Sequence, residues 1–480
     1  MILSSTVERA GEELRSIEGH SYRGYGRLFG NLPAWKPPPN VSDLEQYLWS
    51  LAEGMYVDAV EDNHSIPAGY TYLGQLINHD LTFDASSTLE EKREPILLRN
   101  FRTPRFDLDC VYGRGPRDQS YLYELDGSGK LVLGTNRNGE LDLPRNPFAT
   151  RKKSLLSQNP FDLQGLAVIG DSRNDENIIV SQLHLAFLRF HNRQIDKGIG
   201  FEEARRLTRW HYQWVAIHDY LKRLCGDGLV DEVLGTDGRP CLRFFDPRTH
   251  PYVPIEFAVA AYRGGHSMVR TEYALSSELS RLRGGARLSI FGGIPEDNLV
   301  GGRVLPPGWT VQWNLFVGQT DQAELQFSKR LGPQLSRPLR FLPMPAEPPR
   351  LRSLAFRTLL RGWRMALPSG QDVARRMAEP VIDGNDPLWV YVLKEAYEAG
   401  GHHLGPVGAR IVTEVFIGLL AADPHSYFAI EPNWMPTSGP RFGLENFLAE
   451  AGVSISKEQW ENRLQGAAQT RLQHGAAVVV

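Results

Sequence analysis

Cysteine is scarce in this chain of 480 residues, which contains only Cys110, Cys225 and Cys241. An odd and sparse set of this kind does not form the disulfide framework of small secreted domains. No two of the three form a Cys-x-x-Cys pair, so the sequence does not indicate a zinc site built from cysteine alone. A chain of this length can instead bury a core large enough to be stable without disulfide bonds.

Long apolar runs and an excess of charge of one sign are also missing. No run of about 18 apolar residues occurs, so the sequence predicts no membrane span. The first residues, MILSSTVERAGEELRSIEGH, have no basic stretch followed by an apolar one, so we expect no Sec signal peptide. The protein is therefore expected in the cytoplasm, or secreted without a Sec signal. Lys and Arg number 53 and Asp and Glu 56, a net charge of −3, which argues against a nucleic-acid-binding protein.

Apolar residues recur at helical spacing along much of the chain. In the segment 177–196, Val180, Phe187 and Phe190 lie on one face of a predicted helix. Pro67 is suited to the first position of another helix, which runs to about residue 83. Further helices are predicted at 42–53, 201–224, 254–270, 354–365 and 406–421.

Alternation with a period of two residues is scarce, so the sequence predicts a mainly α fold with little β structure. We expect one large helical domain at residues 61–480, preceded by an arm at 1–60 that packs on it. Residues 85–160 are polar and interrupted by glycine and proline, which predicts a long excursion with short local structure. Residues 466–480 are predicted to be a frayed end.

The motif GQLINHD at 74–80 places an amide and an imidazole on one helix face. Gln75 and His79 are four residues apart and project the same way, whereas Asp80 is rotated away from His79 by about 100°. This face can therefore present Gln75 and His79 to a cavity, while Asp80 serves another site. The alternative is a His satisfied within the core beside a solvated Asp.

The motif GDSRNDEN at 170–177 precedes the amphipathic helix described above. Asp171 or Ser172 can cap that helix. Arg173 then lies at the head of the helix, where the helix dipole disfavours a cation. A buried anion or an oxygen-rich ligand would hold Arg173 there; the alternative is an Arg paired with Asp171 or Asp175.

Two further motifs contain residues suited to a flat ligand and to a cation. In AAYRGGHSMVR, at 260–270, His266 follows two glycines, whose lack of side chains lets a flat group approach the helix closely. In RTPRFDLDCVYG, at 102–113, Asp107 and Asp109 alternate and Thr103 lies nearby, as in loops that bind calcium through oxygen atoms. The alternatives are a core His at a helix kink and a solvated turn.

In this order, the four motifs resemble those of the animal-type haem peroxidase family, which includes myeloperoxidase, lactoperoxidase and the cyclooxygenases. The resemblance runs from about Gly74 to Ala421, and the absence of the mammalian disulfides makes bacterial sequences look most similar. It implies haem b and calcium as cofactors. It also implies that hydrogen peroxide is reduced through a high-valent iron–oxo intermediate while a halide, a pseudohalide or a small phenol is oxidised.

The resemblance assigns three residues to the peroxide-binding face of the haem. His79 is similar to the base that moves a proton from one peroxide oxygen to the other. Arg173 is similar to the cation that stabilises negative charge as the O–O bond breaks. Gln75 is similar to the residue that hydrogen-bonds distal water or halide.

The resemblance also implies a calcium site next to this face. Its ligands would be Asp80, Thr103, the carbonyl of Arg105, Asp107 and Asp109. The family usually has a hydroxyl residue at the position of Asp109, so the added charge is expected to strengthen cation binding.

On the opposite face of the haem, His266 is similar to the iron ligand and Arg263 to a partner of a haem propionate. Gln371 occupies the position of an Asn that orients the iron-bound His in the family. An acceptor at that position makes the His more basic and favours oxidised iron.

Two departures from the family concern covalent links to the haem. Mammalian members esterify the haem through one Asp and one Glu, and these positions are Asn78 and Glu176 here, so at most one ester is expected, through Glu176. A Met that some members use for a sulfonium link is replaced by Asn177. A less distorted haem is less oxidising, so we expect bromide, iodide, thiocyanate or phenolic donors rather than chloride.

Two other functions are considered. Fatty-acid oxygenases of the cyclooxygenase and α-dioxygenase type use a Tyr three residues before the iron ligand, where this chain has Arg263. Tyr262 lies one step further back, which rotates its side chain by about 100° on a helix and turns it from the site. The other alternative is a non-catalytic helical module in which haem or calcium is structural, against which the joint presence of His79, Arg173 and His266 argues.

Overall fold

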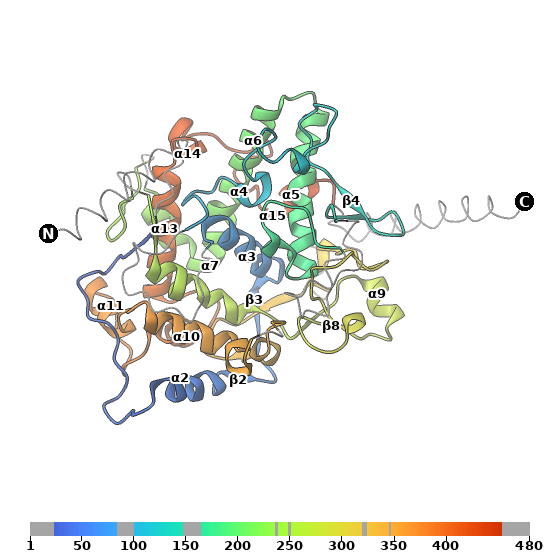
Figure 1. Cartoon of the computed structure of the whole chain (residues 1–480). Helices are drawn as coiled ribbons and strands as arrows, with labels where there is room; N and C mark the ends of the chain where they lie inside the picture. The colour runs from blue at the N-terminus through green and yellow to red at the C-terminus, as the bar shows by residue number, and fades with distance from the viewer. Residues whose placement is uncertain are drawn as a thin grey trace, which may run out of the picture.

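The described part of the chain is mainly α-helical, as the sequence predicts (Figure 1). The structure is a computed structural model that describes residues 24–83, 100–146, 165–235, 239–247, 251–318, 324–344 and 347–453. Its α-helices are α2 (Leu44–Glu53), α3 (Gly69–Leu81), α4 (Asp109–Tyr112), α5 (Ile178–Asp196), α6 (Phe201–Val215), α7 (Lys222–Cys225), α8 (Asp227–Leu234), α9 (Ser277–Leu282), α10 (Leu354–Arg364), α11 (Gly370–Met377), α12 (Leu388–Glu398), α13 (Pro406–Ala422), α14 (Tyr427–Ile430) and α15 (Leu444–Glu450).

The strands of the described residues are short and pair only in twos. Two pairs are parallel: β1 (Tyr25–Gly26) with β6 (Val253–Pro254), and β2 (Tyr56–Val57) with β10 (Leu335–Ser336). Three pairs are antiparallel: β3 (Asp62–Pro67) with β9 (Phe327–Lys329), β4 (Gly134–Thr135) with β5 (Leu141–Asp142), and β7 (Glu272–Tyr273) with β8 (Leu288–Ser289). These pairs connect loops around the helices and form no sheet that could serve as a core layer.

Helices α3, α5 and α13 belong to the interior of the fold. Helix α13 begins with Pro406 at its first turn, a position that needs no backbone N–H. Its residues from Val407 to Leu420 are all buried, Arg410 and Glu414 included, so the helix lies within the core. Helix α5 packs against both α3 and α6, and Asn177 caps its N-terminus by accepting a hydrogen bond from the backbone N–H of Val180. In Figure 1, α3 lies near the centre of the molecule.

The segment around the predicted iron ligand is helical but not an α-helix over 254–270. Residues Glu256–Ala261 form a π-helical segment, η5, and Tyr262–Met268 form a 3₁₀ segment, η6. Because π and 3₁₀ turns distribute side chains differently from an α-helix, spacing arguments made for a regular α-helix fail here. The predicted helix at 201–224 contains a similar π segment, Ala216–Leu221 (η4), between α6 and α7.

The helix predicted to begin at Pro67 begins two residues later. Pro67 is the last residue of β3 and pairs with Phe327, while α3 starts at Gly69. Proline has no backbone N–H to donate to a neighbouring strand, and the end of a strand is a position where this donor is not needed. The backbone N–H of Gly69 instead donates to the carbonyl of Phe316 at 2.8 Å, so a tertiary contact sets the helix start.

Of the arm predicted at 1–60, residues 24–60 are described and contain β1, α2 and β2, with α2 packed against α10. Of the excursion predicted at 85–160, residues 100–146 are described, and they contain α4, β4, β5 and the 3₁₀ turn Ser120–Leu122. The end predicted at 466–480 lies outside the described residues. Among the helices that the structure describes, none is long and apolar enough to cross a membrane.

Candidate active site

Helix α3 presents His79 to the interior, where only 5% of the residue is exposed. The Nδ1 atom of His79 lies 2.8 Å from the side-chain oxygen of Asn174, which can only accept a hydrogen bond. The proton of the neutral ring is therefore on Nδ1, and Nε2 has a free lone pair. Burial, with a further contribution from Arg173, lowers the pKa of His79 to about 3, so the ring is neutral at pH 7 and can act as a proton acceptor.

Arg173 lies against the same end of α3, although it comes from a separate 3₁₀ turn, η3 (Ser172–Asp175). Its Nη2 atom donates to the backbone carbonyl of His79 at 3.0 Å and to Asp171 at 2.6 Å. Its guanidinium carbon lies 4.6 Å from the centroid of the Phe83 ring. The structure thus brings the predicted base and the predicted cation together.

Asp171 determines the local structure before α5. Its carboxylate accepts from the backbone N–H of Arg173 at 2.9 Å and so caps η3, whereas Asn177 caps α5. The prediction that Asp171 or Ser172 caps the long helix is therefore wrong, because a 3₁₀ turn intervenes. Of the two acidic partners considered for Arg173, Asp171 is the one observed, while Asp175 pairs with Arg145 at 2.7 Å.

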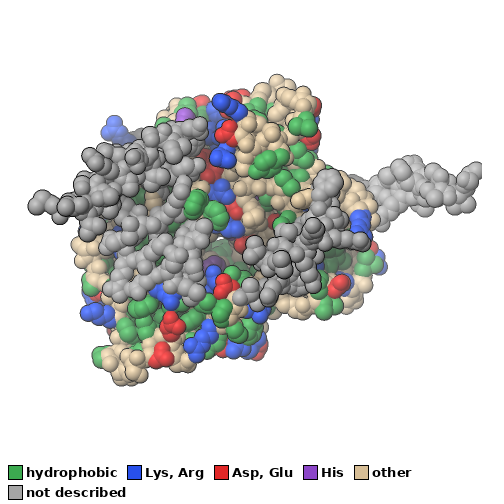
Figure 2. Space-filling view, viewed as in Figure 1, with side chains coloured by type: hydrophobic (Ala, Val, Ile, Leu, Met, Phe, Trp, Pro, Cys, Tyr) green, Lys and Arg blue, Asp and Glu red, His purple; other side chains and the backbone are tan. Residues whose placement is uncertain are grey.

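Gln75, Glu176 and Asn177 form a hydrogen-bonded group beside His79. The amide nitrogen of Gln75 donates to Glu176 at 3.0 Å, and that of Asn177 donates to the Gln75 oxygen at 3.1 Å. Glu176 is exposed to solvent, yet burial by the surrounding protein raises its pKa to about 7. Glu176 therefore has free space beside it within densely packed protein. Figure 2 shows a hollow near the centre of this face of the molecule.

His266 lies on η6 next to open space. An added Cβ at the preceding residue, Gly265, would meet no atom within 4 Å, so the backbone leaves room for a flat group here. The Nδ1 atom of His266 is buried without a hydrogen-bond partner among the described residues. Burial and the charge of Arg263 lower the pKa of His266 to about 3, so its ring is neutral, which is the state that ligates iron.

Arg263 is one turn before His266. Its Nε atom donates to the carbonyl of Ala258 at 3.0 Å, and its two terminal nitrogens have no partner among the described residues. Burial lowers the pKa of Arg263 to about 10, a sign that the guanidinium is poorly solvated. An anionic group of a ligand would satisfy it.

Tyr262 joins the two halves of the site. Its hydroxyl donates to the carbonyl of Gly74 on α3 at 3.0 Å, which places η6 beside the helix of Gln75 and His79. Its ring stacks on Phe257, with centroids 4.9 Å apart. The side chain of Tyr262 is therefore occupied in packing.

Gln371 is not brought to the imidazole of His266. It is buried at the start of α11, where its amide nitrogen donates to Asp386 at 3.1 Å and its oxygen accepts from the Asp386 backbone at 2.9 Å. Its longer side chain allows it to close the 370–386 loop instead. Among the described residues, no hydrogen bond joins it to His266.

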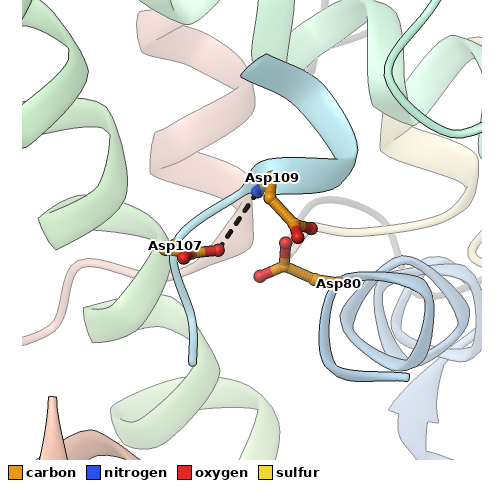
Figure 3. Close-up of side chains that lie close together, drawn as sticks. All are labelled: Asp80, Asp107 and Asp109. Atoms are coloured by element: carbon orange, nitrogen blue, oxygen red, sulfur yellow. Dashed lines mark hydrogen bonds between the residues drawn. The ribbon is translucent and has the colours of Figure 1, made fainter. Parts of the chain in front are cut away.

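Asp80, Asp107 and Asp109 converge on one point (Figure 3), with one carboxylate oxygen of each within 4.8 Å of the others. One oxygen of Asp80 is buried without a hydrogen-bond partner in the described structure, and so is one of Asp109, although Nη1 of Arg102 lies 3.4 Å from it. Burial and the neighbouring Asp107 raise the pKa of Asp80 to about 7 and that of Asp109 well above its usual value. Three clustered carboxylates with orphaned buried oxygens fit a hard cation such as calcium.

The other residues predicted for this cation site lie in the same loop. The hydroxyl of Thr103 donates to Asp107 at 2.7 Å. Arg105 lies between Thr103 and Asp107 in the sequence. Its Nε atom is 3.8 Å from a carboxylate oxygen of Asp423. Leu108 adopts a left-handed conformation, with φ of 58°, and its N–H donates to Asp80 at 3.2 Å. The loop is therefore tied directly to the helix that carries His79.

Sequence reasoning missed Asn174 and Arg102. Asn174 directly follows Arg173, but only the packing of η3 against α3 brings it to His79. Arg102 begins the cation loop and pairs with both Asp109 and Asp171. No local signal distinguishes either residue from an ordinary polar side chain.

Comparisons with known proteins find similarity to haem peroxidases. The sequence model of the animal haem peroxidase family matches residues 82–290. A peroxidase of Drosophila melanogaster is 28% identical over 219 residues, which cover 43% of this chain and 31% of that protein. Thyroid peroxidase of Mus musculus is 25% identical over 202 residues, 38% of this chain and 22% of that protein. The alignments thus span less than a third of these relatives.

Solved structures show the same fold. Peroxidase A from Dictyostelium discoideum has a TM-score of 0.62 at 15% identity, covering 91% of this chain and 94% of that one. A fatty acid alpha-dioxygenase from Arabidopsis thaliana has a TM-score of 0.57 at 15% identity, covering 92% and 77%. The chain is therefore similar in sequence to the animal haem peroxidase family over residues 82–290, and it shares the fold of peroxidase A.

Proposed function

We propose that the protein is a haem peroxidase that reduces hydrogen peroxide and oxidises a small donor, such as a halide, a pseudohalide or a phenol. The observation that supports this best is the pairing of a neutral, buried His79 with the guanidinium of Arg173 at one end of α3. Peroxide cleavage needs a proton acceptor and a positive charge within reach of the same O–O bond.

Haem b fits the residues of the site. His266 would ligate the iron, the open space beside Gly265 would admit the ring, and Arg263 would pair with a propionate. Glu176, which is exposed and accepts a hydrogen bond from Gln75, would form one ester link. When bound, the haem would supply the iron and the two electrons that reduction of the peroxide consumes.

The protein's own residues would manage the protons and the charge. Nε2 of His79 takes a proton from one oxygen of hydrogen peroxide and returns it to the departing oxygen, which leaves as water. Arg173 stabilises the negative charge that develops on that oxygen. Gln75 orients a water or a halide in the hollow. Calcium bound by Asp80, Thr103, the carbonyl of Arg105, Asp107 and Asp109 would hold the end of α3 in place.

Fatty-acid oxygenation is the second candidate, because the fold is shared with a fatty acid alpha-dioxygenase. That chemistry needs a Tyr radical next to the haem. The hydroxyl of Tyr262 is hydrogen-bonded to Gly74 and its ring stacks on Phe257, which argues against this role. Turnover of a polyunsaturated or long-chain fatty acid without added peroxide would favour this candidate instead.

The test is an absorption spectrum of the haem-supplied protein before and after one equivalent of hydrogen peroxide. We expect a Soret band that shifts and then returns when iodide or a phenol is added. The substitution His79→Ala should abolish the rapid shift, while His425→Ala, which alters an exposed histidine, should not. A Soret band with no response to peroxide would indicate a structural haem, and no band would refute haem binding.

A further inference from the structure

Arg102 lies between the cation site and the peroxide site. It is 9% exposed, and its two terminal nitrogens reach two different carboxylates. Nη1 lies 3.4 Å from Asp109 of the cation cluster, whereas Nη2 forms a short ion pair with Asp171 and also donates to the carbonyl of Gly170 at 3.4 Å. One guanidinium is therefore shared between two buried acidic groups.

Asp171 is shared in the same way. Its carboxylate receives Nη2 of Arg102 and also both Nε and Nη2 of Arg173, at 3.1 and 2.6 Å. The two guanidinium groups flank the same aromatic ring, that of Phe83, with their central carbons 5.6 and 4.6 Å from its centroid. The result is a continuous line of charges: Asp109, Arg102, Asp171 and Arg173.

The strength of each pairing in this line depends on the next one. In a site of low dielectric, a guanidinium that is attracted more strongly to one carboxylate neutralises the other less. A divalent cation at Asp109 competes with Arg102 for that carboxylate, so Arg102 turns its charge toward Asp171. Asp171 then binds Arg173 less strongly, which leaves more of the positive charge of Arg173 available to a ligand.

We propose that Arg102 is a positioning residue that couples occupation of the cation site to the anion-binding strength of Arg173 through Asp171. This inference rests on the proposed function only for its consequence in peroxide cleavage. The coupling itself is a property of the four charged side chains. Because coupling between sites is reciprocal, a change at Arg173 must alter cation affinity by the same route.

A double-mutant cycle in the full-length, haem-free chain tests the coupling without a measurement of enzymatic activity. The dissociation constant of Tb³⁺, a luminescent probe for calcium sites, is measured for wild type, Arg173→Gln, Arg102→Gln and the double variant. In Arg173→Gln, Asp171 attracts Arg102 more strongly and releases Asp109, so Tb³⁺ should bind about fivefold more tightly. In the Arg102→Gln background, the same substitution at Arg173 should change the affinity less than about twofold.

Controls separate this route from simple charge effects. Arg114→Gln removes a positive charge from an exposed position of the same loop region and should leave the cycle unchanged. Arg102→Lys keeps the charge, but a single ammonium replaces the fork that bridges two carboxylates, so it should also weaken the coupling. If Arg102→Gln does not fold, Arg102→Lys replaces it in the double-mutant cycle. An equal effect of Arg173→Gln in both backgrounds would overturn the proposal, as would the absence of Tb³⁺ binding.

A second measurement uses the haem-supplied protein and cyanide, followed by the Soret band. Saturating calcium should tighten cyanide binding about fivefold in wild type and less than about twofold in Arg102→Gln. Equal tightening in the two proteins would overturn the coupling while the peroxidase assignment stood. A normal Tb³⁺ cycle in a protein without a Soret band would instead refute the peroxidase assignment and support the coupling.

Discussion

The Nδ1 atom of His79 lies 2.8 Å from the side-chain oxygen of Asn174, and the amide nitrogen of Asn174 lies 3.0 Å from Nδ1 of His184. Asn174 is fully buried and holds both rings at once. Its oxygen accepts from His79 and its nitrogen donates to His184, so the contact selects the tautomer of each ring. The orientation of the proposed base therefore depends on one asparagine.

Substitution of Asn174 tests this dependence. In Asn174→Leu, the His79 ring loses its acceptor and can adopt the other tautomer, so the rate constant for the reaction with peroxide should fall by about 10- to 100-fold. Asn174→Asp keeps an acceptor and should retain more of the rate. Stopped-flow measurement of the Soret shift gives the rate constant. Asn192→Ala removes another buried asparagine, which is hydrogen-bonded to Leu131 within the described residues, and should leave the rate constant unchanged. An equal loss in both variants would contradict the prediction.

Glu176 is expected to form the only ester link to the haem. After treatment with a few equivalents of peroxide, acidic organic extraction should remove haem from Glu176→Gln and leave it on wild type. Asn78→Gln, which alters the neighbour of His79 without changing a carboxyl group, should behave as wild type. Equal extraction of haem from wild type and Glu176→Gln would show that no ester forms.

Removal of calcium should destabilise the protein, because the three clustered carboxylates then repel one another and the ion pair of Arg102 with Asp109 offsets this repulsion only in part. Calcium at about 100 times its dissociation constant should add about 2.7 kcal/mol to the free energy of unfolding. Asp109→Ser removes one ligand charge and should weaken calcium binding by on the order of tenfold. Unfolding curves in calcium and in EGTA measure both effects, and identical curves for the wild type would exclude a calcium site.

Stability should decrease as the pH falls below about 6.5. His184 and His191 are both fully buried, and burial lowers the pKa of each from 6.5 to about 4. Between these pH values the unfolded chain binds a proton that the folded chain excludes, so each residue removes on the order of 3 kcal/mol of stability by pH 4.

Urea unfolding at several pH values between 7 and 4.5 measures this slope. His191→Gln should reduce the slope near pH 5 by about one proton, or roughly 1.4 kcal/mol per pH unit. His425→Gln, at an exposed position, serves as the control and should keep the wild-type slope. A slope in His191→Gln equal to that of wild type would contradict the assignment of His191.

The sequence by itself determined those features that depend on short spacings. Gln75 and His79 share a face of α3 because they are four residues apart, and the apolar stripe of α13 follows from the same period. The glycine before His266 leaves open space because it has no side chain. The alternating Asp107 and Asp109 lie in one loop with Thr103, whose hydroxyl donates to Asp107. In each case the covalent chain holds the residues at a set separation.

Only the tertiary structure decided which distant side chains meet. Asn174 contacts His79 across 95 residues of sequence, and Arg102 contacts Asp171 across 69. The turn of Gln371 toward Asp386 is of the same kind. Such contacts depend on how α3, η3 and the cation loop pack against one another. No local period encodes that packing, since it results from the burial of the whole core.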